Sequence, residues 1–109
     1  MKISIKPLSV NGAWKGRRFK SDEYKQYERD ILMILPRFEV PVGRLSLYLE
    51  FGFSSRGADF DNPIKPFTDC LQKKYGFNDN KVFEAHIKKV IVKKGEEYIK
   101  FEIKELENV

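Results

Sequence analysis

Residues 45–53 alternate without interruption between apolar side chains and the residues that separate them. The apolar set consists of Leu45, Leu47, Leu49, Phe51 and Phe53. A period of two residues is typical of a β-strand that is buried on one face. We therefore expect a central strand here, with a second layer packed on its apolar face.

The segment after this strand predicts a helix. Asn62 is a suitable N-cap, Pro63 fits the first helical position, and Gly76 is placed to end the helix. Apolar side chains recur between them at helical spacing, at Ile64, Phe67, Leu71 and Tyr75. This stripe is expected to face the core.

The N-terminal third of the chain predicts one strand and one helix. The strand covers residues 2–6 and ends at Pro7, and the helix begins at the N-cap Ser21 and ends before Pro36. One face of that helix carries Tyr24, Tyr27, Ile31, Ile34 and Leu35. Buried tyrosines on this face would need hydrogen-bond partners.

Two further strands complete the pattern. The first covers residues 82–94, and its alternation is broken near Lys88 and Lys89, which predicts a bulge. Residues 94–96 have a tight hairpin sequence, and Ile99, Phe101 and Ile103 mark the buried face of the returning strand. We expect one small α+β domain over residues 1–109, in which a mixed sheet of about four strands packs with two helices in the order β-α-β-α-β-β.

The charge balance indicates a class of partner. The chain has 109 residues, with 21 basic and 16 acidic side chains and a net charge of +5. This surplus favours an acidic partner such as nucleic acid or a membrane surface, although it also serves solubility alone. We expect no membrane span, because no apolar run approaches roughly 20 residues, and no signal peptide. The single Cys70 excludes an internal disulfide framework and suits a reducing cytoplasm.

Asp59 and Asp61 lie between the central strand and the helix, a common place for ligand sites. In an extended segment, residues two apart point the same way, with Cβ atoms roughly 6–7 Å apart. Two such carboxylates can hold one Mg²⁺, which completes its shell with water and substrate phosphate. A third carboxylate, Asp79, follows the helix. The alternative for the first two is turn and capping work, which most loop aspartates do.

Lys65, Asp69 and Gln72 lie on the side of the helix away from its apolar stripe. Lys65 is in the first turn, where its ammonium can stabilise negative charge on a phosphate or orient a water molecule. We interpret Asp69, four residues later, as the ion-pair partner that positions Lys65 rather than as a metal ligand.

Residues 9–20 are expected to form a loop, since Asn11-Gly12 and Gly16 are turn signals. The loop carries Lys15, Arg17, Arg18 and Lys20 and no acidic residue. These side chains favour phosphate contact, because like charges repel unless a partner neutralises them. Trp14 and Phe19 among them either stack on unpaired bases or tuck into the core.

A second basic cluster consists of Lys88, Lys89, Lys93 and Lys94. These lysines either contact DNA or protect an edge strand from pairing with other chains. His86, the only histidine, shares a strand face with Glu84. One histidine without a nearby cysteine is a poor transition-metal site, so we expect this pair to be structural or exposed.

Together these motifs resemble the RusA family of Holliday-junction resolvases, small endonucleases of phage and prophage origin. The matching residues are Asp59-Phe60-Asp61-Asn62, Lys65, Asp69, Gly76-Phe77, Asp79 and Val82, with Ser9-Val10-Asn11 before the basic loop and Lys94-Gly95 in the late turn. The resemblance covers nearly the whole chain. Its specific part is the spacing of the two aspartates, the asparagine and the lysine, followed by a carboxylate beyond the helix.

The resemblance implies a function. Members of the family are homodimers that bind four-way DNA junctions and cut them with Mg²⁺ or Mn²⁺. By resemblance, the metal ligands would be Asp59, Asp61 and Asp79, Lys65 would be essential to cleavage, and Asp69 and Asn62 would support the site. The implied DNA contacts are Asn11, Lys15, Arg17, Arg18, Lys20 and Arg56. A cytoplasmic location in a bacterial host, from a phage or prophage gene, is implied in the same way.

Two positions depart from the family pattern. Asn78 stands where members often carry another acid, which would alter metal affinity, and Pro66 lies inside the first helical turn, where it removes one backbone hydrogen bond. Two other functions stay open. One is a DNA-binding or architectural protein without catalysis. The other is a magnesium enzyme acting on nucleotides or another phosphate substrate, which has little support because the sequence contains no glycine-rich phosphate loop.

Overall fold

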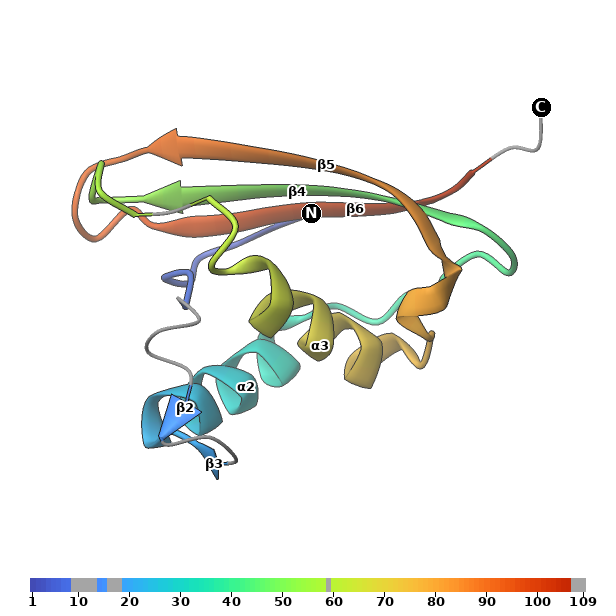
Figure 1. Ribbon diagram of the computed structural model, residues 1–109, viewed down its shortest axis with the longest axis horizontal. Helices are drawn as coiled ribbons and strands as arrows, with labels where there is room; N and C mark the ends of the chain where they lie inside the picture. The colour runs from blue at the N-terminus through green and yellow to red at the C-terminus, as the bar shows by residue number, and fades with distance from the viewer. Residues whose placement is uncertain (9–13, 16–18, 59, 107–109) are drawn as a thin grey trace.

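The computed structural model describes residues 1–8, 14, 15, 19–58 and 60–106. They form a four-stranded sheet with two helices packed on one of its faces (Figure 1), which confirms the predicted α+β architecture. The sheet consists of β1 (Lys2–Ile3), β4 (Leu45–Phe53), β5 (Val82–Ile91) and β6 (Tyr98–Glu105). The helices are α2 (Asp22–Ile34) and α3 (Ile64–Tyr75), and a 3₁₀ turn, η1 (Asp79–Lys81), leads into β5.

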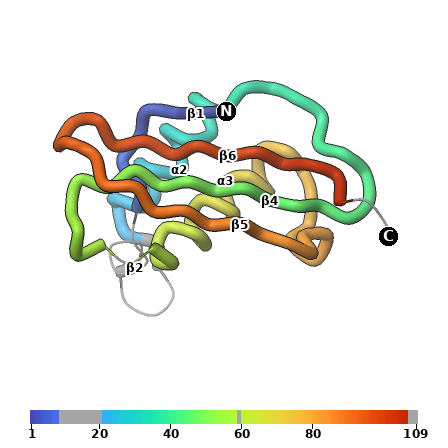
Figure 2. The backbone as a smooth tube through the Cα atoms, turned by 90° about the horizontal axis from the view of Figure 1, so that it is seen from above, coloured from blue at the N-terminus to red at the C-terminus, as the bar shows by residue number. Residues whose placement is uncertain are grey.

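Strand β4 is one of the two interior strands of the sheet. The strand order is β1-β6-β4-β5 (Figure 2), and β4 pairs in parallel with β5 and antiparallel with β6. Its five apolar side chains are all buried beneath the helices. The alternation of residues 45–53 therefore predicts this central strand correctly.

The predicted hairpin between β5 and β6 is wrong. Residues 93–96 do turn sharply, with Gly95 at φ +93° and the Glu96 N–H donating to the Lys93 carbonyl at 2.9 Å. The two strands do not pair, because β4 lies between them. An interior strand has unpaired backbone groups on both edges, and here β5 satisfies one edge of β4 and β6 the other.

Both outer strands are shorter than predicted. β1 ends at Ile3, because the Ile5 N–H turns back to the Ile3 carbonyl at 3.2 Å, and β5 ends at Ile91. The pairing of β5 with β4 is regular at Lys88 and Lys89, so no bulge lies there. The register shifts instead at Phe83, near the start of β5.

The core lies between the sheet and the helices. Its helical residues include Tyr24, Tyr27, Ile31, Phe67, Cys70 and Leu71. The ring of Phe67 meets those of Phe51 and Phe101 edge-on, with centroids 6.1 and 5.5 Å away. The Tyr27 hydroxyl is buried without a hydrogen-bond partner among the described residues, so the partner expected for it is not found there.

The boundaries of α2 follow the sequence closely. Ser21 caps the helix as predicted, and its Oγ accepts the Tyr24 N–H at 3.1 Å. Ile34, predicted to lie on the buried face, is 44% exposed. The chain leaves the helix at this residue, and the extended Leu35 takes the core position instead.

The start of α3 differs by one residue from the prediction. Pro63 is the N-cap rather than Asn62, and Pro63 has no side-chain acceptor for the free N–H groups. A turn precedes the helix instead, closed by the Ile64 N–H and the Asp61 carbonyl at 3.2 Å. Gly76 ends the helix as predicted, in the left-handed conformation with φ +72°.

Candidate active site

The loop that joins β4 to α3, residues 54–63, is called the acidic loop here. It leaves the carboxyl end of the central strand and enters the N-terminus of α3 (Figure 1). Asp61 is exposed in this loop, and its backbone carbonyl helps to close the turn into the helix. Asp59 lies outside the described residues, so the predicted convergence of the two carboxylates stays a prediction.

Lys65 lies in the first turn of α3 with its side chain 71% exposed. Its ammonium donates to Oδ1 of Asp69 at 3.3 Å, which confirms the predicted pair of residues four apart. Asp69 also faces α2, where burial and then the charge of Asp69 raise the pKa of Tyr24. Asp69 is therefore held between a buried phenol and the exposed lysine, and it is placed to orient the lysine.

Asp79 lies at the other end of α3. Its backbone N–H donates to Oε1 of Gln72 at 3.2 Å, beside the last turn of the helix. Asp61 precedes Ile64, the first helical residue. From Ile64 to Gln72 the helix rises about 12 Å. Asp61 and Asp79 are thus not brought together within one chain.

These positions decide how well the acids fit a metal ion. The oxygen ligands of Mg²⁺ lie about 2.1 Å from the ion, so carboxylates that share one ion must nearly touch. Asp59 and Asp61 are expected to meet this requirement because they are two residues apart, whereas Asp79 of the same chain lies at the other end of α3. In the part of the chain that the structure describes, no three histidine, cysteine or acidic residues gather into a metal-binding group.

Lys89 is a residue of this region whose role the sequence does not reveal. It lies on β5 opposite Phe51, and its ammonium donates to the backbone carbonyls of Arg56 at 2.9 Å and Ala58 at 2.5 Å. Both carbonyls belong to the acidic loop. The signal in the sequence is a lysine at an inward position of β5, where the broken alternation predicts a bulge instead.

The structure describes part of the basic segment that was predicted to contact DNA. Lys15 and Lys20 belong to β2 (Trp14–Lys15) and β3 (Phe19–Lys20), which pair as a short ribbon where only a loop was predicted. Asn11, Arg17 and Arg18 lie outside the described residues, and the DNA contacts proposed for this segment stay predictions.

The second basic cluster lies at an edge of the sheet, because β5 is an outer strand. Lys88 approaches Glu50 on the helix-free face, with 4.0 Å between Nζ and Oε1. His86 and Glu84 share that face, and their ring nitrogen and carboxylate are 2.6 Å apart in an exposed pair. The hydrogen bond from His86 lowers the pKa of Glu84.

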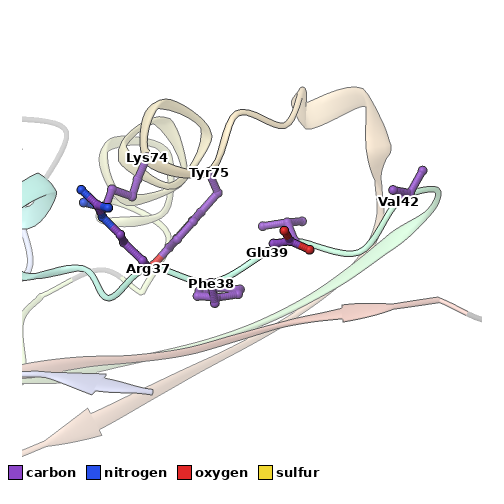
Figure 3. Close-up of a pocket in the computed structure, with 7 residues that line it drawn as sticks. Arg37, Phe38, Glu39, Val42, Lys74 and Tyr75 are labelled. Atoms are coloured by element: carbon purple, nitrogen blue, oxygen red, sulfur yellow. The ribbon is translucent and has the colours of Figure 1, made fainter.

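Two hollows lie beside α3. The larger, of about 670 Å³, is lined by the connection after α2 and the last turn of α3 (Figure 3). Two of its polar groups already bond to neighbouring backbone: the Tyr75 hydroxyl donates to the Pro36 carbonyl at 2.6 Å, and Lys74 donates to the carbonyl of Leu32 in α2 at 3.0 Å. It lies at the opposite end of α3 from the acidic loop, so we assign it no part in the site.

The smaller hollow, of about 270 Å³, is a mostly apolar groove between α3 and β5. It is lined by Leu47, Leu49, Ile64, Thr68, Gln72, Phe77, Asp79, Val82, Ala85 and Ile87. The groove therefore extends along α3 from its first residue to Asp79.

Comparison of the sequence with known proteins finds no matching family model and no matching curated protein. Among the described residues, none of the helices combines the length and the apolar character needed to cross a bilayer.

Proposed function

We propose that this protein is a Mg²⁺-dependent endonuclease that resolves four-way DNA junctions in recombination and repair. The observation that carries the proposal is the arrangement at the start of α3. Exposed Asp61, two residues after Asp59 in the acidic loop, is followed at the first helical turn by exposed Lys65, which Asp69 holds at 3.3 Å. Carboxylates and a cation in this order suit hydrolysis of a phosphodiester.

Each residue has a chemical part in this reaction. Asp59 and Asp61 would hold Mg²⁺, or Mn²⁺, and a bound ion supplies an activated water and neutralises charge on the phosphoryl oxygens. Lys65 donates to the oxygen on which negative charge develops. Asp69 fixes the direction of the Lys65 ammonium, and Asn62 lies in the turn that orients the first turn of the helix.

Asp79 joins this site only if a second chain supplies it. Asp61 and Asp79 lie at opposite ends of α3, roughly 12 Å apart along its axis. A twofold axis across the middle of the α3–β5 groove would exchange the two ends. Asp79 of each chain would then face Asp59, Asp61 and Lys65 of the other, and the homodimer would hold two identical sites.

The charges near the acidic loop support DNA as the substrate. The turn after β5 lies at the same end of the sheet as this loop, since the Ser54 hydroxyl donates to Glu97 at 2.9 Å. Arg56, Lys93 and Lys94 are exposed there, and they can bind phosphates on both sides of the cleaved bond. The ribbon residues Lys15 and Lys20, with Asn11, Arg17 and Arg18, extend the proposed DNA surface. A bacterial cytoplasm, with a phage or prophage gene, is the proposed setting.

A cleavage assay tests the proposal. Labelled four-way junction and linear duplex are incubated with the protein in Mg²⁺ and in EDTA, and Asp61→Asn is tested in parallel. We expect cuts in the junction alone, only with Mg²⁺, and none from the variant, which keeps its affinity for the junction. Binding without any nicking by the wild-type protein would instead identify a non-catalytic DNA-binding or architectural protein.

A further inference from the structure

Lys89 links strand β5 to the acidic loop through two hydrogen bonds. Its ammonium donates to the Arg56 carbonyl at 2.9 Å and to the Ala58 carbonyl at 2.5 Å. The same nitrogen lies 5.9 Å from the centre of the Phe53 ring, at the end of β4. A half-buried lysine thus spans from the edge strand to a loop more than thirty residues earlier in the chain.

The contact with the Ala58 carbonyl lies directly before the proposed metal ligands in the chain. The Ala58 carbonyl belongs to the peptide unit that leads directly into Asp59. The bonds that the loop makes within itself are longer: the Ala58 N–H donates to the Ser55 carbonyl at 3.4 Å, and the Gly57 N–H donates to Ser55 Oγ at 3.3 Å. Hydrogen bonds from a charged donor are shorter and stronger than neutral ones. The lysine therefore supplies charge-assisted hydrogen bonds to the backbone before the aspartates, in addition to the bond from the Ser54 hydroxyl to Glu97 at 2.9 Å.

We infer that Lys89 is a positioning residue, which holds the peptide before Asp59 so that Asp59 and Asp61 face one metal ion. The inference rests on the proposed function for the identity of the ligand. Lys89 touches neither metal nor DNA in this role and acts through the loop. Groups that orient metal ligands in this way typically change metal affinity about 10–100-fold when they are removed.

Lys88 provides a matched control. It is the neighbouring residue on the same strand and carries the same charge, but it lies on the helix-free face near Glu50. Lys88→Met and Lys89→Met therefore remove the same charge from the surface, and only Lys89→Met releases the acidic loop. Lys89→Arg keeps a cationic donor and should restore part of the effect.

The test measures three quantities for each variant: amide hydrogen exchange of residues 56–62 without metal, the Mg²⁺ concentration for half-maximal cleavage, and junction affinity in EDTA. For Lys89→Met we expect faster exchange in the loop and a Mg²⁺ requirement at least about tenfold higher. Junction affinity should equal that of Lys88→Met, whose loop exchange and Mg²⁺ requirement should match those of the wild type.

Two results would overturn the inference. One is identical behaviour of Lys89→Met and Lys88→Met, and the other is faster loop exchange with an unchanged Mg²⁺ requirement. Should Lys89→Met not fold, Lys89→Gln takes its place. A wild-type protein that does not cleave junctions refutes the proposed nuclease instead, and the exchange measurement then decides by itself whether Lys89 holds the loop.

Discussion

At the scale of single residues, Lys65 and Asp69 show what the sequence can predict about a site. Their contact depends only on helical spacing, because residues four apart share one side of a helix, and the structure confirms it. The bond from Lys89 to the acidic loop depends on how β5 lies beside β4, and no local pattern contains that information.

Lys65→Ala should retain junction binding and lose cleavage by about 10²-fold or more, since it removes one donor to the developing charge. One lysine is a small share of the 21 basic residues, which is why affinity should hold. Lys73→Ala is the matched control, because Lys73 lies on the same helix and pairs with Glu28 at 2.6 Å. Single-turnover cleavage and equilibrium binding separate the two effects. Equal cleavage rates for the two variants would show that Lys65 is an ordinary surface charge with no part in cleavage.

We expect the free energy of unfolding to fall in alkali because of Tyr98. Burial, together with its hydrogen bond to Glu50, raises the pKa of Tyr98 to about 12, from an ordinary value of 10. The unfolded chain therefore loses this proton first. The contribution to stability is complete below pH 10 and is lost as the pH rises towards 12.

Urea unfolding between pH 9 and 11.5 measures this loss. The free energy of unfolding of the wild-type protein should fall more steeply with pH than that of Tyr98→Phe, which has no proton to lose at this position. Parallel curves for the two proteins would show that Tyr98 does not contribute.

At the scale of elements, the sequence predicts β4 and α3 well because each follows one period over its whole length. Pro66 also becomes understandable: it is the third residue of α3, where an N–H would have no partner within the helix, and it is buried in the core. The expected loss of a helical hydrogen bond is therefore not a cost here. The predicted pairing of β5 and β6 is wrong because a turn sequence fixes the reversal of the chain and not the neighbour of each strand.

The close packing of β4 against β6 predicts the effect of Gly52→Ala. A Cβ at this position would lie 2.5 Å from two carbons of the Tyr98 ring, so the ring must move. We expect a loss of about 1–3 kcal/mol in the free energy of unfolding, as is usual for overpacking. Gly57→Ala is the control, since its nearest atom, Ser55 Oγ, is 3.8 Å away. Equal urea midpoints for the two variants would contradict this packing.

At the scale of the whole molecule, the positions of Asp61 and Asp79 indicate that one chain cannot form the complete proposed site by itself. The family resemblance implies that Asp61 and Asp79 share one metal site, but the length of α3 between them keeps them apart in one chain. A four-way junction is approximately twofold symmetric and needs two opposed cuts, so a dimer with shared sites would match both the substrate and the geometry. The mass of such a dimer is twice 12.9 kDa.

Mixing two inactive variants tests this account most directly. Asp61→Asn and Asp79→Asn are each expected to be inactive on a four-way junction in Mg²⁺. In a mixed dimer with shared sites, one site combines the intact Asp61 of one chain with the intact Asp79 of the other. Co-expressed and purified as the mixed dimer, the variants should therefore nick one strand of the junction, whereas either variant alone should not. No nicking by the mixed dimer, with normal cleavage by the wild-type protein, would contradict the shared site.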